Sequence, residues 1–463
     1  MSAAPEPVAT PAKVPPDTLF VVLTALLILA VQAFSERPVY PNLSIGWPMV
    51  NSGDEPHYLI LVNSLLLDGD LDLKNNYFAM HLGADQAGKK FIGSGIDHHA
   101  SWYIDGERKI WSELFNPHVG SWPRGGQGEL IQVLRPGVPQ EIAYTPEYSA
   151  HPVGIALLLA PFLFPFRGTE WLEIMAVFYA GVATALAMAL FRRWLWRFTH
   201  ELHSIRITTL AVFLASPVWY YSRGFFNEPF LVLTVIGTFA FALEPRRAWA
   251  SGAFLGAGML MKPQLALVGL PLGLWFLWKR KWRDAVLFGL VPTLVVVLIL
   301  ILNKKMYGSY ARGPYPFYQG DFWVGFEGLM KAENRGLLYF FPASFFAALG
   351  WPLLLKKAKW EAAFPLFGFL SVLGLTSIWK YWDGGSCFGP RLLVPVLPLL
   401  GLGLVAMLDS KWLGSFAPRW WLYLAIIAGL LANGLGVARY WGAVNAAPNS
   451  YVPMILLAPR VPM

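Results

Sequence analysis

Two adjacent carboxylates, Asp54 and Glu55, lie in the sequence SGDEPHY shortly after the first apolar segment. Pro56 suits the first position of a helix, where its missing N–H costs nothing. Both acids should therefore lie at a helix N-terminus, where the helix dipole favours anions. We expect Asp54 to act as a general base there, with Glu55 as its partner and with His57 and Tyr58 contacting the substrate. The alternative is an acidic pair that only caps a helix.

A cation begins a later apolar segment. Arg391 follows the sequence WDGGSCFGP and precedes a continuous apolar run. A positive charge at a helix N-terminus is electrostatically unfavourable, whereas a bound phosphate would compensate for it. The glycines would let the backbone approach such a ligand closely. We expect Arg391 to bind a phosphate group; the alternative is an arginine that reaches the lipid headgroups.

Four further charged residues begin or interrupt apolar runs. Glu228 precedes Pro229 at the start of a segment and could orient substrate hydroxyls, or could be an ordinary helix-terminal acid. Lys262 interrupts a long apolar stretch, and ionisable residues inside membranes are functional by default. Arg335 repeats the pattern of a cation at a helix start, although a salt bridge to Glu333 would also explain it. Lys380 is a weaker substrate-binding candidate, because it also suits an interfacial anchor.

Metal and nucleotide cofactors find little support in the sequence. The single cysteine, Cys387, rules out an intrachain disulfide and Cys-based zinc sites. Asp68, Asp70 and Asp72 resemble the start of a calcium loop, but the glycine and glutamate that an EF-hand requires are missing. The histidines between residues 81 and 151 show no metal-ligand spacing, and no phosphate-binding loop or dinucleotide fingerprint occurs. We expect no cofactor; a divalent ion held by two or three acids stays open.

The composition is that of a polytopic membrane protein. Of 463 residues, 56% are hydrophobic and 14% are charged, against about 25% charged residues in soluble domains. The net charge of +8 comes from basic clusters between apolar runs, which is the positive-inside pattern rather than a nucleic-acid surface. The sequence therefore predicts an all-α bundle that lies in a lipid bilayer and binds no nucleic acid.

The positions of the basic clusters set the expected topology. Residues 1–16 form a disordered cytoplasmic tail, 17–438 a transmembrane domain, and 439–463 an external tail. Within that domain, 35–170 form a large external loop with juxtamembrane helices. The segment 151–166 is short and broken by prolines, so we interpret it as re-entrant rather than spanning. About eleven spans result, near 18–34, 171–191, 207–222, 229–243, 249–261, 264–278, 285–302, 337–355, 362–379, 391–408 and 420–438.

Several of these segments together resemble one known group of enzymes. The sequences SGDEPHYL, SLLLDGDLDLKNNY, HPVGIALLLAPF, NEP, ENRGLLYFFP and GGSCFGPRLLVPVLP are similar to segments of the bacterial GT-C glycosyltransferases related to the protein O-mannosyltransferases and the lipid A aminoarabinose transferase. Two departures are Glu333-Asn334, where Ser-Pro-Gly is expected, and Cys387 in the glycine loop. The resemblance implies a GT-C bundle, a polyprenyl-phosphate-linked sugar as donor, an active site on the outer face, and the first-loop acid as catalytic residue.

The expected reaction follows from these residues. Asp54 takes the proton of an acceptor hydroxyl, which displaces the lipid phosphate without a metal and inverts the anomeric centre. Arg391 stabilises the leaving phosphate, helped by Lys262 and Arg335. The acceptor could be a glycolipid, a polysaccharide or a protein, and the enzyme should lie in the bacterial inner membrane with its site facing the periplasm. The alternatives are a transporter or flippase of lipid-linked sugars, and a ligase or oligosaccharyltransferase of a preassembled glycan. The sugar, the acceptor, the prenyl length and the oligomeric state stay open.

Overall fold

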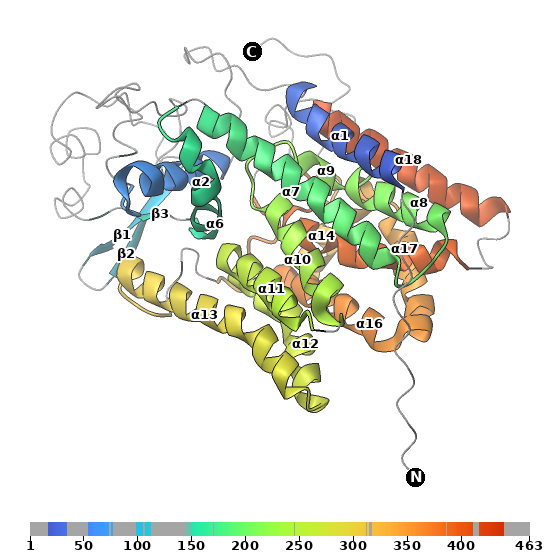
Figure 1. The fold of residues 1–463 in the computed structure, drawn as a ribbon. Coiled ribbons are helices and arrows are strands. Elements are labelled where there is room, and N and C mark those ends of the chain that lie inside the picture. The colour runs from blue at the N-terminus through green and yellow to red at the C-terminus, as the bar shows by residue number, and fades with distance from the viewer. Residues whose placement is uncertain are drawn as a thin grey trace.

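Helices make up most of the described part of the chain (Figure 1). The computed structural model describes residues 17–34, 54–73, 76, 99–104, 107–112, 146, 148–149, 151–169, 171–244, 246–311, 313, 317–385, 387–410 and 416–438. The tails at 1–16 and 439–463 and most of the external loop lie outside these residues, so the predictions made for them stay predictions.

Five helices within the described residues are long and apolar enough to cross a membrane. They are α7 (Trp171–Leu195), α13 (Trp282–Tyr307), α16 (Ser344–Ile378), the pair η6 (Arg391–Val396) and α17 (Leu397–Leu408), and α18 (Phe416–Ala438). Shorter apolar helices accompany them, including α1 (Thr18–Phe34), α8 (Leu202–Phe213), α10 (Glu228–Ala242), α11 (Ala248–Met261) and α12 (Ala266–Trp278). The prediction of a helical membrane protein is confirmed, and the number of eleven spans stays a prediction.

Three predicted spans differ in detail from the helices observed. The segment 207–222 is divided between α8 and a short helix, α9 (Pro217–Tyr221), because Ser216 and Pro217 interrupt the run and begin a new helix. Conversely, 337–355 and 362–379 fall mostly within α16, whose helical backbone is broken at Lys359, where φ is 38°. The expected boundary near 356–361 is therefore a one-residue break instead of a loop.

The region predicted to be external contains short elements beside the bundle. Helix α2 (Glu55–Asn63) continues into the π-helical turn η1 (Ser64–Asp68) and packs against α6 (Gly154–Leu163), which the 3-10 turn η4 (Phe164–Phe166) ends. Three strands, β1 (His99–Ile104), β2 (Glu107–Ser112) and β3 (Tyr148–Ser149), form an antiparallel sheet in the order β2-β1-β3. This small sheet is an addition to a chain that is otherwise mostly helical, as predicted.

Ion pairs tie the helix ends together at the predicted cytoplasmic side. Asp17, just before α1, accepts hydrogen bonds from Arg206 of α8 at 2.6 and 2.9 Å and lies 3.3 Å from Arg192 of α7. The hydrogen bond from Arg206 holds the pKa of Asp17 below its usual value. Asp409 accepts a hydrogen bond from Ser204. The first helix is thus fixed to the bundle by charge as well as by apolar packing.

Glycines allow close contact between α16 and α17. A Cβ on Gly350 would overlap the carbonyl oxygen of Gly403, and a Cβ on Gly403 would overlap that of Ala347. Small residues at helix contacts are the usual means by which membrane helices approach closely. This contact fixes the helix that continues from η6, and so helps to position Arg391.

We expect Gly350→Leu to lower the midpoint of thermal unfolding in detergent by several degrees, because overpacking costs about 1–3 kcal/mol. Gly374→Leu is the matched control on the same helix, since nothing lies within 4 Å of a Cβ placed there. Equal midpoints for the two variants would contradict the close helix contact.

Candidate functional site

An arginine between two carboxylates forms the centre of the site. Nη2 of Arg391 donates a hydrogen bond to Oδ2 of Asp54 at 2.6 Å, and its Nε donates to Oε1 of Glu228 at 2.8 Å. Arg391 and Glu228 are 8% and 2% exposed. The sequence predicted that Asp54 and Arg391 share one site, and the structure places them in direct contact. This cluster joins the start of α2, the start of α10 and the start of η6.

The local backbone leaves these side chains available to one another. Asp54 is the N-cap residue of α2, but its side chain makes no capping hydrogen bond, so its carboxylate reaches Arg391 instead. Glu228 is the first residue of α10. The chain turns into η6 through Gly389, which has a φ of 61° and leaves no room for a side chain beside Phe340. Each of the three charged residues therefore lies at the first turn of a helix, and the rest of that helix packs in the apolar core.

The charges set the protonation state of Asp54. Burial of the carboxyl favours its neutral form, but the adjacent Arg391 guanidinium outweighs burial and holds the pKa of Asp54 well below its usual range. Asp54 is therefore ionised at every physiological pH. The guanidinium also lies over the ring of Phe226, 4.7 Å from its centroid.

Glu228 keeps one oxygen without a partner. Its Oε2 is buried and has no hydrogen-bond partner within the described residues. Such an atom costs about 1–3 kcal/mol when nothing binds it. Lys262 lies at the junction of α11 and η5 (Pro263–Leu265), where burial lowers its pKa and the charge of Glu228 partly restores it. An acceptor oxygen and a second cation therefore accompany the ion-paired cluster.

A pair of histidines adjoins Asp54. The rings of His57 and His151 stack with centroids 4.9 Å apart, and Tyr58 meets His151 edge-on at 5.4 Å. Nδ1 of His151 lies 3.9 Å from Oδ2 of Asp54. Of these three residues, His151 is the one that sequence reasoning did not propose for the site. The available signal was its place at the start of HPVGIALLLAPF, one of the segments that carry the resemblance.

Glu55 faces a different partner from the one expected. Its Oε1 accepts a hydrogen bond of 2.6 Å from the backbone N–H of Phe225, and the side chain is buried. A Cβ on Gly224 would overlap this oxygen. The contact fixes the start of α2 to the turn before α10, so Glu55 holds Asp54 and Glu228 in register.

Arg335 contacts the glycine loop, and Lys380 contacts the segment around Tyr318. Nη1 of Arg335 donates to the carbonyl oxygen and the carboxylate of Asp383, at 2.8 and 3.1 Å, and to the carbonyl oxygen of Gly385. It therefore braces the glycine loop before Arg391, and the alternative pairing with Glu333 is not what is observed. The backbone N–H of Lys380 pairs with the carbonyl of Tyr318. A contact with the substrate stays a prediction for both.

The described residues offer neither a reactive thiol nor a ready-made metal site. Burial raises the pKa of the Cys387 thiol to about 11, so it is a poor nucleophile at neutral pH. No group of three or more His, Cys, Asp or Glu side chains suited to a metal occurs in the part of the chain that the structure describes.

Replacing Arg391 should lower the thermal stability of the protein by an amount that depends on pH. In Arg391→Gln, the buried carboxylate of Glu228 and the half-buried carboxylate of Asp54 lose their counter-charge, which costs about 3–5 kcal/mol. Without the guanidinium the pKa of Asp54 rises, so protonation restores part of this loss as the pH falls. We expect the difference in unfolding midpoint between variant and native protein to shrink from pH 7 to pH 5, measured by thermal unfolding in detergent.

The matched control for this experiment is Arg335→Gln. Its partner Asp383 has a side chain that is 40% exposed, so that variant should show a small, pH-independent deficit. A deficit in Arg391→Gln that stays constant or grows on acidification would contradict the ion-paired cluster.

No family model and no curated protein matches this chain. Among solved structures, it is similar to the crystal structure of ArnT from Cupriavidus metallidurans in the apo state, with 16% identity and a TM-score of 0.49, covering 90% of this chain and 64% of that one. It is also similar to the crystal structure of this ArnT bound to undecaprenyl phosphate, with 16% identity and a TM-score of 0.47, covering 95% and 71%. This chain thus spans a little under two thirds of the first ArnT chain. ArnT is the lipid A aminoarabinose transferase, to which the sequence motifs also show a resemblance.

Proposed function

We propose that this chain is an integral membrane glycosyltransferase that transfers a sugar from a polyprenyl-phosphate-linked donor to an acceptor hydroxyl. The observation that carries the proposal is the contact of Asp54, Arg391 and Glu228 at the ends of three elements. It supplies a base, a phosphate-binding cation and a buried acceptor oxygen within one cluster. The ArnT structure that holds undecaprenyl phosphate names the type of lipid to test first.

Arg391 retains binding capacity beyond its two carboxylates. A guanidinium carries five N–H donors, and Nη1 has no hydrogen-bond partner within the described residues. A donor phosphate that binds Nη1 adds negative charge beside Asp54. Lys262, which is half-buried and close enough to feel the charges of Glu228 and Asp54, would supply a second cation for the same phosphate.

The low pKa of Asp54 makes the carboxylate a weak base while Arg391 holds it. As the bond between the anomeric carbon and the phosphate oxygen breaks, negative charge grows on the leaving polyprenyl phosphate and attracts the guanidinium. Asp54 then regains basicity, takes the proton of the acceptor hydroxyl, and the acceptor oxygen bonds to the anomeric carbon from the opposite face. The products are the inverted glycoside and free polyprenyl phosphate. No metal is needed in this step.

Glu228 and the residues of α2 suit the binding of sugar hydroxyls. The unpartnered Oε2 of Glu228 would accept a hydrogen bond from a hydroxyl of the donor or the acceptor. His57 and Tyr58 lie beside Asp54 and would contact the same groups. Glu55 takes no proton in this scheme and holds α2 in position.

An apolar groove suits the lipid chain. It has a volume of about 330 Å³ and lies between η1 and α6, lined by Leu65, Leu66, Leu157, Ala160, Pro161 and Phe164. Both elements lead away from the site, since α6 begins just after His151 and η1 follows α2. A prenyl chain in this groove would place its phosphate toward Arg391. The proposed setting is a bacterial inner membrane, with the site at its outer face.

We expect Asp54→Asn to reduce transfer by about 10²–10⁴-fold, the usual contribution of a general base, with expression and membrane insertion unchanged. The assay incubates purified protein with a panel of polyprenyl-phosphate sugars and follows the release of free polyprenyl phosphate. Asp284→Asn, in the first turn of α13, is the control and should keep full activity. Full activity of Asp54→Asn would end the base assignment. A flippase would release no polyprenyl phosphate in any variant.

Arg391→Lys keeps one positive charge but loses the planar fork that binds two groups at once. We expect the apparent KM for the donor to rise by about tenfold or more, while the apparent KM for the acceptor changes little. An unchanged donor KM would contradict phosphate binding by Arg391.

A further inference from the structure

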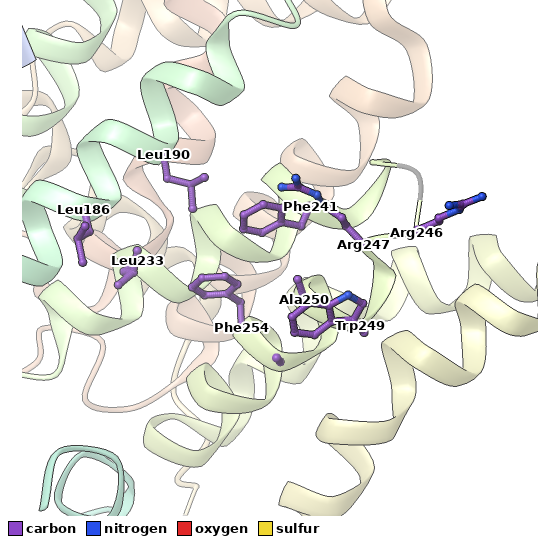
Figure 2. Close-up of a pocket in the computed structure, with 10 residues that line it drawn as sticks. Leu186, Leu190, Leu233, Phe241, Arg246, Arg247, Trp249, Ala250 and Phe254 are labelled. Carbon is purple, nitrogen blue, oxygen red and sulfur yellow. The ribbon is translucent and has the colours of Figure 1, made fainter. Parts of the chain in front are cut away.

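A second, separate cavity lies between α7, α10 and α11 (Figure 2). Its volume is about 750 Å³, which is within the range of ligand sites, about 300–1,000 Å³. Apolar side chains line most of it: Leu186, Leu190, Leu233, Phe241, Trp249, Ala250, Ala253 and Phe254. Two arginines, Arg246 and Arg247, complete the lining.

This cavity is distinct from the candidate active site. Helix α10 begins at Glu228 and ends at Ala242, so its 15 residues separate Glu228 from the arginine end of the cavity by about 22 Å. None of the residues that line the cavity belongs to the cluster around Arg391. In the predicted topology the cavity therefore opens near the cytoplasmic face, whereas the site lies at the outer face.

Positive charge gathers at the arginine end of the cavity. Glu244 pairs with Arg193 at 3.2 Å, with Arg197 at 3.0 Å and with Arg247 at 3.1 Å. Three cations thus share one carboxylate, and Arg246 adds a fourth that is exposed. This excess of positive charge would attract an anionic ligand.

The backbone directs Arg246 outward. Its φ of 61° lies in the left-handed region, which a non-glycine residue adopts rarely. Figure 2 shows the side chain of Arg246 extending away from the helices at the mouth of the cavity, while Arg247 lies next to Phe241. Both arginines line the cavity, so a headgroup at this end of it would lie beside them.

We propose that this cavity binds one anionic glycerophospholipid of the cytoplasmic leaflet, with an acyl chain among the apolar side chains and its phosphate between Arg246 and Arg247. A soluble anion would leave the apolar walls unoccupied, and a neutral lipid would leave the arginines uncompensated. Trp249 and Leu186 are 58% and 55% exposed, as expected of side chains at a lipid-facing entrance, where tryptophan is enriched.

The test is a titration of the purified full-length protein with phosphatidylglycerol or phosphatidylcholine, with bound lipid counted by native mass spectrometry. We expect one phosphatidylglycerol to bind more tightly than any phosphatidylcholine. One arginine near a headgroup is worth about fivefold in affinity. Arg246→Gln should therefore weaken this binding about fivefold, and the double variant Arg246→Gln/Arg247→Gln about 25-fold.

Arg280→Gln is the matched control, because Arg280 is also exposed and has a φ of 54°, but does not line the cavity. It should bind phosphatidylglycerol as the native protein does. A second variant, Ala253→Phe, fills the cavity and should abolish tight binding while both arginines remain. Equal affinity for the two lipids, an equal loss in Arg280→Gln, or unchanged binding in Ala253→Phe would each overturn the proposal.

Discussion

The contact of Arg391 with Asp54 and Glu228 is the interaction on which the site depends. It brings together residues 337 and 163 positions apart along the chain. Taking charges out of water is costly, and a buried group of this kind is favourable only when each charge keeps a partner. The three groups carry one positive and two negative charges, and Lys262 lies near enough to offset the excess. The arrangement is therefore stable at rest and sensitive to any added anion.

That sensitivity suits a group-transfer reaction at a membrane. In the proposed reaction, the carboxylate of Asp54 is too weakly basic to activate water while Arg391 holds it, so a bound donor would be protected from hydrolysis. A donor phosphate would compete with Asp54 for the Arg391 guanidinium only as negative charge develops on the leaving phosphate. The backbone beside these charged groups is held in place by two contacts. Glu55 bonds to the turn before Glu228, and Arg335 bonds to the glycine loop before Arg391.

The apolar helices and most of the charged residues of the candidate site could be predicted from the sequence. The features that could not be predicted depend on backbone angles and on packing between distant segments. Hydropathy and charge indicated the apolar helices. Charges at expected helix starts indicated Asp54, Glu228 and Arg391 as candidates, and a charge that interrupts an apolar run indicated Lys262. The break in α16 at Lys359 and the division at Ser216 depend on backbone angles that the apolar pattern does not encode. In the small sheet, β1 and β2 are six residues long but their sequences, HASWYI and ERKIWS, do not alternate regularly between polar and apolar residues, and β3 has only two residues. The stacking of His151 on His57 depends on the packing of α6 against α2, which no local pattern reveals.

The contact of Glu55 with the turn before α10 has an evolutionary consequence. The carboxylate occupies the space that a side chain at position 224 would need. A larger residue at 224 would displace the Glu55 carboxylate and break its hydrogen bond with the backbone N–H of Phe225, unless position 55 carried a shorter side chain. Positions 55 and 224 are therefore not free to vary independently, and a change at one selects for a matching change at the other.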